Sequence, residues 1–242
     1  MEVLRVIHLN FAYSGDKRWE DLNFGLEEGK IYALLGRNGS GKSTVLRLLT
    51  GILRPQGGEI LWMGKRLDRM TPGELSRYVA TVWTGMPAGE MKVSEILKTA
   101  GNFSSALWSR VSEELALEPL MQRSVASLSD GERQRVMLGR ARLTDAPVLL
   151  LDEPLAHLDL PNKAGVLAWL QSAASEGKTV LFSTHEPALV RDVADAFFLL
   201  DKGKLSMATG RELLESLQRL FRHKFLTFDK ECGYFKIKRD EY

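Results

Sequence analysis

The sequence predicts an α/β protein built on a mostly parallel sheet, with an N-terminal antiparallel β subdomain and a helical insertion subdomain. Three observations lead to this fold class. Short apolar runs alternate with amphipathic helical patterns along much of the chain. The run VLLL at 148–151 is apolar at every position, as in a parallel strand covered on both faces. Between about 84 and 145 the patterns are mainly helical, so this stretch interrupts the alternation.

Each element is predicted from its local periodicity. The first strands alternate polar and apolar side chains, whereas the later ones are short apolar runs bounded by glycine or polar residues. The helices carry apolar residues at three- and four-residue spacing. In chain order, the predicted strands cover 2–13, 22–29, 31–35, 57–64, 78–83, 148–151, 179–185 and 196–204, and the predicted helices cover 43–51, 93–100, 105–117 and 129–141.

Composition and charge are those of a globular protein. The 242 residues are 44% hydrophobic, and the net charge of +2 provides no overall attraction to nucleic acid or anionic lipid. The single cysteine, Cys232, excludes an intrachain disulfide and suits a reducing cytoplasm. No apolar run approaches the about 20 residues that span a bilayer, and the first residues do not resemble a signal peptide. We therefore expect a soluble protein, unless a partner holds it at a membrane.

The loop GRNGSGKST at 36–44 is the first strong motif. It matches G-x-x-x-x-G-K-[ST] and lies between a predicted buried strand and a predicted helix, the context that this motif requires. Its backbone N–H groups would surround phosphates, Lys42 would reach the β- and γ-phosphates, and the Ser43 hydroxyl would ligate Mg²⁺. The alternative is a glycine-rich turn without a ligand. The predicted phosphate-binding residues are Gly36, Arg37, Asn38, Gly39, Ser40, Gly41, Lys42, Ser43 and Thr44.

Two adjacent carboxylates supply the second half of a nucleotide site. Asp152 and Glu153 follow the buried run 148–151, at the strand end where open α/β sheets bind their ligands. We predict that Asp152 holds Mg²⁺ and that Glu153 orients or deprotonates an attacking water. A structural carboxylate pair is the alternative, but such a pair is costly at a buried strand end without a cation.

His185 ends the predicted strand 179–185 and therefore lies on the same rim of the sheet. A lone histidine is often structural or simply exposed, but this position favours contact with the γ-phosphate. Lys42, Glu153 and His185 are accordingly the predicted catalytic residues, and Ser43 and Asp152 are the predicted metal ligands.

The stretch SLSDGERQRVMLGRA at 127–141 begins a helix. Ser129 suits the N-cap position, and Glu132 three residues later completes a capping-box pattern. Gly131 between them allows a close approach to the backbone. A helix N-terminus attracts anions, so phosphate binding is the second interpretation beside simple capping.

The motifs, and the order in which they follow one another along the chain, resemble those of ATP-binding-cassette (ABC) transporter ATPase subunits over roughly 3–221. The parts are an aromatic residue (Tyr13), the P-loop, the LSDGE signature, the Walker B acids, a D-loop ending at Asp159, and a switch histidine. The resemblance implies that Tyr13 stacks on adenine. It also implies a head-to-tail dimer in which Ser129, Gly131, Glu132 and Asp159 complete the ATP site of the other protomer, Glu132 replacing the family's usual glutamine.

Two features depart from the family pattern. Thr84 stands at the family's glutamine position, and no glutamine occurs between Gln56 and Gln122. The resemblance implies a single ABC ATPase domain over 1–222 with the helical insert at about 84–145, and leaves a C-terminal tail at 223–242. The tail segments KFLTF and YFKIK flank DKECG as in a β-hairpin packed at an edge. Its basic residues alternate with aromatic ones, so contact with a partner or nucleic acid is the alternative.

The leading functional hypothesis is a Mg²⁺-dependent ATPase that powers a membrane transporter. Within that class the chain resembles importers of iron chelates, haem or cobalamin. The implied partners are transmembrane permease subunits, a second copy or a related cassette, and optionally a substrate-binding protein, with no nucleic acid. The implied location is cytoplasmic, on the inner face of the cell membrane. The alternatives are a soluble ABC ATPase working in iron–sulfur assembly, on ribosomes or on DNA, and a non-catalytic nucleotide-binding regulator.

Overall fold

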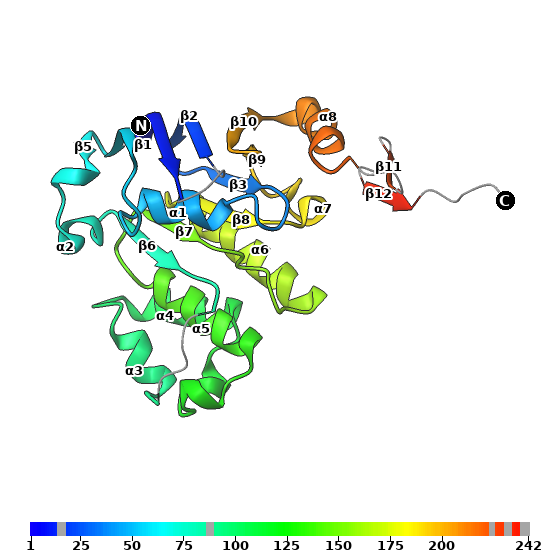
Figure 1. Ribbon diagram of the computed structural model, residues 1–242. Helices are drawn as coiled ribbons and strands as arrows, with labels where there is room; N and C mark the ends of the chain where they lie inside the picture. Colours follow the sequence, from blue (N-terminus) through cyan, green and yellow to red (C-terminus); the bar gives the residue numbers. More distant parts are fainter. Residues whose placement is uncertain (14–17, 86–89, 223–225, 230–233, 238–242) are drawn as a thin grey trace.

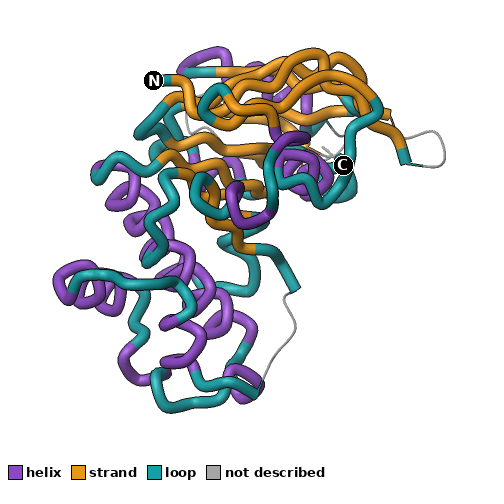
Figure 2. The backbone as a smooth tube through the Cα atoms, turned by 90° about the vertical axis from the view of Figure 1, so that its left-hand side faces the viewer, coloured by secondary structure: helices purple, strands orange, loops and turns teal. Residues whose placement is uncertain are grey.

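The computed structural model describes residues 1–13, 18–85, 90–222, 226–229 and 234–237 (Figure 1). It confirms the predicted fold class, because a largely parallel sheet, an antiparallel sheet and a helical region are all present (Figure 2). Among the described residues, no helix combines the length and the hydropathy needed to cross a bilayer.

The antiparallel sheet comes from the N-terminal part of the chain and has the strand order β2-β1-β4-β5. Its strands are β1 (Glu2–Ala12), β2 (Arg18–Glu27), β4 (Gly57–Trp62) and β5 (Lys65–Arg66). The prediction started the second strand at Leu22, but the structure starts it at Arg18. The reason is a tertiary contact, because Trp19 is buried and pairs with Phe11 of β1.

The second sheet has the strand order β10-β9-β3-β8-β7-β6. Its strands are β3 (Ile31–Leu35), β6 (Val79–Val82), β7 (Val148–Leu151), β8 (Thr179–Thr184), β9 (Ala196–Asp201) and β10 (Lys204–Ala208). All neighbours pair in parallel except β9 and β10. The carboxyl ends of β3, β7 and β8 therefore meet at one rim of the sheet.

The strand predicted over 196–204 is a hairpin in the structure. Strand β9 ends at Asp201 and β10 returns from Lys204. Lys202 and Gly203 between them both have positive φ, 46° and 77°. A two-residue hairpin turn of the primed type requires this backbone conformation, which reverses the chain.

The helices are α1 (Lys42–Leu49), α2 (Pro72–Leu75), α3 (Val93–Lys98), α4 (Ser105–Glu114), α5 (Asp130–Arg142), α6 (Leu160–Ser175), α7 (Pro187–Val190) and α8 (Gly210–Leu220). Short 3₁₀ turns cover Leu67–Arg69, Glu118–Leu120 and Val125–Ser127. Helices α3, α4 and α5 form the helical region, which projects from the sheets in Figures 1 and 2.

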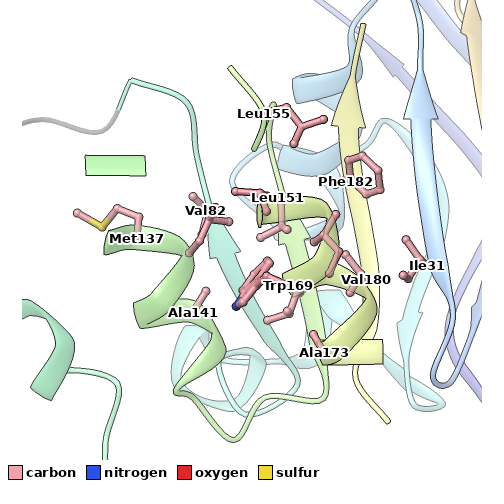
Figure 3. Close-up of a cluster of buried hydrophobic side chains, with 14 of the residues drawn as sticks. Ile31, Val82, Met137, Ala141, Leu151, Leu155, Trp169, Ala173, Val180 and Phe182 are labelled. Atoms are coloured by element: carbon pink, nitrogen blue, oxygen red, sulfur yellow. The ribbon is translucent and has the colours of Figure 1, made fainter. Parts of the chain in front are cut away.

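Two hydrophobic clusters cover the two faces of the parallel sheet. Along β3, Ile31 and Leu35 belong to one cluster and Leu34 to the other, as the alternation of side chains in a strand requires. The first cluster contains residues of α5 and α6, including the fully buried Trp169 (Figure 3). The second contains α1 and the antiparallel sheet. Helices α1 and α5 therefore pack on opposite faces of the sheet.

The tail contains β11 (Leu226–Asp229) and β12 (Tyr234–Ile237), which pair antiparallel. The residues between the two strands lie outside the described part of the chain, and so does Cys232. The pair forms a sheet of its own and does not add to an edge of either larger sheet.

Candidate active site

The P-loop connects the buried strand β3 to α1. Gly41 is the N-cap of α1, with φ 103° in the left-handed region, and no side chain caps this helix N-terminus. Its first N–H groups thus remain for an anion. The Lys42 side chain is buried, and its Nζ donates a hydrogen bond to the carbonyl of Gly36 at 3.0 Å. The loop therefore presents backbone donors and one ammonium group at the same place.

Asp152 lies at the end of β7 beside the start of α1. Its Oδ1 accepts hydrogen bonds from Ser43 Oγ at 3.0 Å and from Ser183 Oγ at 2.7 Å. The carboxylate is buried, so these two hydroxyl groups fix its orientation. The predicted metal-binding pair, Ser43 and Asp152, is thus brought together from α1 and the end of β7, the third parallel strand along the chain.

Glu153 bridges two of the other predicted residues. Its Oε1 lies 3.1 Å from Lys42 Nζ, and its Oε2 lies 3.0 Å from His185 Nδ1. A carboxylate oxygen accepts hydrogen bonds, so the His185 tautomer with its hydrogen on Nδ1 donates to Glu153 in this contact. Glu153 has φ 50°, a conformation uncommon outside glycine and typical of functional positions.

Ser183 is a residue of the site that the sequence interpretation missed. Its hydroxyl donates to Asp152 and accepts from the backbone N–H of Glu153 at 2.9 Å, so it orients both acidic residues. The side chain is fully buried within β8. The only signal in the sequence is a small polar residue directly after the apolar run VLF at 180–182, two positions before His185.

Tyr13 lies beside the P-loop helix. Its hydroxyl is 3.3 Å from Thr44 Oγ1, and its ring meets Phe11 edge to face with centroids 4.9 Å apart. The side chain is 42% exposed, so part of it remains accessible to a ligand. The residue predicted to stack on adenine therefore lies next to the residues predicted to bind phosphates.

Ser129 and Glu132 form the predicted capping box at the start of α5. The Ser129 hydroxyl accepts from the Glu132 N–H at 3.2 Å, and Glu132 Oε2 accepts from the Ser129 N–H at 2.8 Å. That backbone hydrogen bond, together with the nearby Arg123 guanidinium, holds the pKa of Glu132 below its usual value. Glu132 thus caps its own helix.

The close approach expected at Gly131 comes from the D-loop of the same chain. A Cβ added to Gly131 would lie 3.1 Å from the carbonyl oxygen of His157 and from a methyl group of Leu158. Asp159 at the end of this loop is the N-cap of α6, and its side chain accepts from the Asn162 N–H at 3.0 Å. The signature and the D-loop therefore lie side by side, whereas α1 with its P-loop residues packs on the other face of the sheet.

Comparison with known proteins decides the family. A protein-family model described as "ABC transporter" matches residues 19–156, more than half of the chain.

This chain belongs to the ABC transporter family.

An uncharacterized ABC transporter ATP-binding protein of Haemophilus influenzae is 31% identical over 236 residues, covering 91% of this chain and 89% of the relative. The cobalt import ATP-binding protein CbiO of Salmonella paratyphi A is 32% identical, covering 85% of this chain and 80% of the relative. A solved structure described as "An inward-facing conformation of a putative metal-chelate type ABC transporter" superimposes with a TM-score of 0.78, 30% identity and 99% coverage of both chains. The chain is thus an ATP-hydrolysing subunit of an ABC transporter.

In this ABC ATPase, the P-loop arginine takes a structural role. Arg37 Nε donates to the carbonyl of Leu220 at 3.0 Å, and its Nη2 donates to the carbonyl of Arg222 at 2.8 Å. A guanidinium at a helix C-terminus stabilises the exposed carbonyls there. The Arg37 side chain is thus turned toward the end of α8, and its backbone alone remains for phosphate.

Thr84 replaces the glutamine of the ABC pattern and contacts the Walker B backbone. Its Oγ1 donates to the carbonyl oxygen of Asp152 at 2.8 Å. The following residues, 86–89, lie outside the described part of the chain. Thr84 is therefore hydrogen-bonded to the main chain that carries Asp152 and Glu153, the two predicted site carboxylates.

We expect Thr84→Ala to lower the basal rate of ATP hydrolysis by less than about tenfold, because the change removes one hydrogen bond worth about 1 kcal/mol. The steady-state ATPase rate of the purified protein measures this. Thr84→Val is the matched control, since it keeps the shape without the hydroxyl and should behave like the alanine variant. A loss as deep as that expected for Glu153→Gln would make Thr84 a direct ligand of the metal or of the attacking water.

Proposed function

We propose that this chain hydrolyses ATP with Mg²⁺ to drive a transporter for a metal ion or a metal chelate. The observation that carries the proposal is the single cluster formed by Lys42, Ser43, Asp152, Glu153 and His185 at the rim of the parallel sheet. The metal class rests on the cobalt-importing relative and the metal-chelate type structure. Iron chelates, haem and cobalamin are candidate cargoes within that class.

Ser43 and Asp152 fit a magnesium site. Both supply hard oxygen atoms, the donors that Mg²⁺ prefers, and these atoms lie 3.0 Å apart beside the P-loop. These two residues would hold the ion together with phosphate oxygens and water. When bound there, the ion neutralises charge on the β- and γ-phosphates. Ser183 keeps the Asp152 carboxylate in place for this role.

Lys42 and Glu153 change partners when ATP binds. Lys42 is a donor that pairs with Glu153 at 3.1 Å, and the phosphates of ATP carry more negative charge than one carboxylate. ATP therefore draws Lys42 to the phosphates and releases Glu153 to accept a proton from water. The imidazole of His185 stays next to Glu153 and orients it.

A second copy of the chain completes the site. Helix α5 presents Ser129 and backbone N–H groups at its N-terminus, on the face of the sheet opposite α1. One helix N-terminus stabilises an anion by only about 0.3–1 kcal/mol, so it completes a site that other groups have already formed. A head-to-tail dimer brings this N-terminus to the γ-phosphate held by the other copy.

A groove beside the site suits a helix of the membrane subunit. A cavity of about 680 Å³ lies among the end of α1, α2, β4 and β6, and apolar side chains such as Leu53, Leu67 and Met70 line it. Ile52 at its margin is 60% exposed. Trp83 lines the groove and directly precedes Thr84, whose hydroxyl donates a hydrogen bond to the Asp152 carbonyl. A helix seated in the groove would thus contact the chain segment that supports the catalytic carboxylates.

We expect Ile52→Glu to reduce recovery of the co-expressed membrane subunit about tenfold or more, because a carboxylate replaces an apolar contact in the groove. Recovery is measured by copurification of the two proteins from detergent-solubilised membranes. Met207→Glu is the control, since Met207 is 62% exposed and lies on β10, away from the groove. Equal recovery of both variants would exclude the groove as the docking site.

The same complex in proteoliposomes tests the cargo. ATP-dependent movement of cobalt ion, cobalamin, haem or an iron chelate supports the metal class, whereas movement of none of them contradicts it. If the unmodified chain associates with no membrane protein, a soluble ABC ATPase becomes the better description.

A further inference from the structure

Trp19 packs directly on the residue that begins the P-loop helix. It lies in β2 and is 3% exposed. A Cβ added to Gly41 would lie 2.1 Å from Cζ2 and 3.0 Å from Nε1 of the indole. The nitrogen-bearing edge of Trp19 therefore faces Gly41, and only glycine fits there.

The indole Nε1–H of Trp19 has no hydrogen-bond partner among the residues that the structure describes, which leave out 14–17. An indole nitrogen is a donor and never an acceptor, so it needs an oxygen or another acceptor opposite it. Buried donors are almost always paired, because removal from water without a partner is costly. By contrast, Trp62 in the same hydrophobic cluster donates its Nε1–H to the carbonyl of Leu49 at 2.9 Å.

The surroundings of the Trp19 Nε1–H favour an acceptor brought by a ligand. It faces the uncapped N-terminus of α1, where the backbone also offers N–H donors. Donors gathered at a helix N-terminus attract oxygen atoms that carry negative charge. The nearby Tyr13 hydroxyl is already engaged with Thr44.

Trp19 also lies between the predicted base site and the phosphate site. Its ring meets that of Tyr13 nearly edge to face, with centroids 6.0 Å apart and an interplanar angle of 76°. A nucleotide with its base on Tyr13 and its terminal phosphates at Lys42 has to pass Gly41 and hence the edge of Trp19. The part of the nucleotide at this point is the ribose or the first phosphate.

We propose that the Nε1–H of Trp19 donates a hydrogen bond to an oxygen of the bound nucleotide, at the ribose or the adjoining phosphate. This inference rests on the proposed ATP site and adds a binding residue to it. The indole ring then forms a second aromatic wall beside Tyr13.

The test compares Trp19→Phe with Trp62→Phe in a Glu153→Gln background, in which we expect ATP hydrolysis to be strongly slowed. Trp19→Phe keeps an aromatic ring and removes the donor, so we expect about tenfold weaker ATP binding by calorimetry. Trp62→Phe removes a donor that is paired within the protein, so we expect lower thermal stability with an unchanged Kd. A Trp19→Phe protein that binds ATP as tightly as the Trp62→Phe protein would overturn the proposal.

Two probes distinguish the ribose from the phosphate. If the acceptor is a phosphate oxygen, Trp19→Phe also weakens binding of inorganic tripolyphosphate. If it is a ribose oxygen, tripolyphosphate binding is unchanged and only nucleotides are affected. Failure of the Trp19-containing parent to bind ATP would instead contradict the proposed function.

A second measurement needs no substitution at Trp19. The chain has five tryptophans, and ¹⁵N-tryptophan labelling gives each indole N–H its own resonance. We expect the Trp19 resonance to shift on ATP addition while that of Trp62 stays in place. An unmoved Trp19 resonance at saturating ATP would overturn the proposal even if Trp19→Phe does not fold.

Discussion

Glu153→Gln is expected to lower the rate of ATP hydrolysis by about 10²–10⁴-fold, the usual contribution of a general base. The amide keeps the size of the carboxylate and can still hydrogen-bond to its neighbours, but it cannot take a proton from water. ATP binding should therefore persist, and the dimer should accumulate with ATP bound. Steady-state turnover and size-exclusion chromatography with ATP measure the two effects.

The matched control for this variant is Glu186→Gln. Glu186 follows His185 directly but pairs with Lys163 at 2.7 Å, outside the catalytic cluster. Its amide variant should hydrolyse ATP at nearly the normal rate. Near-normal hydrolysis by Glu153→Gln would remove Glu153 from the role of general base.

Lys42→Ala and Ser129→Arg are each expected to abolish most hydrolysis, and a mixture of the two chains is expected to regain part of it. In a mixed dimer, one site combines the altered P-loop with the altered signature, and the other site is intact. The proposed shared site is supported by the position of α1 and α5 on opposite faces of the sheet. The ATPase rate as a function of mixing ratio measures the recovery.

Two outcomes would contradict the shared site. In the first, neither single variant loses activity; in the second, no mixing ratio restores any activity. A chain carrying both changes, mixed with the Lys42→Ala chain, is the negative control, because no dimer in that mixture contains an intact P-loop.

Local sequence patterns predicted the features of this structure that depend on residues only a few positions apart in the chain. Glycine spacing identified the P-loop, because few other residues adopt the φ of 103° found at Gly41. The capping box at Ser129 could be predicted because its two partners, Ser129 and Glu132, are only three residues apart. Asp152 and Glu153 were readable because a short apolar run leaves them at the end of a buried strand.

Contacts between distant segments were beyond the reach of these patterns. Ser183 orients Asp152 only because β7 and β8 are neighbours in the sheet, and strand order is not written in either strand. The approach of His157 to Gly131 and of Trp19 to Gly41 likewise depends on tertiary packing. The turn at Lys202 did carry a local signal, the Asp-Lys-Gly sequence, which the strand prediction passed over.

The hydrogen bonds from Arg37 to the carbonyls of Leu220 and Arg222 connect the C-terminal end of α8 directly to the P-loop. Force applied to the chain after Arg222 is transmitted through two backbone carbonyls to a residue directly after Gly36 in the P-loop. We therefore expect a fusion partner, an affinity tag or a further domain at this end to act on the P-loop without perturbing the core. Variation after Arg222 is then expected to change the affinity for ATP.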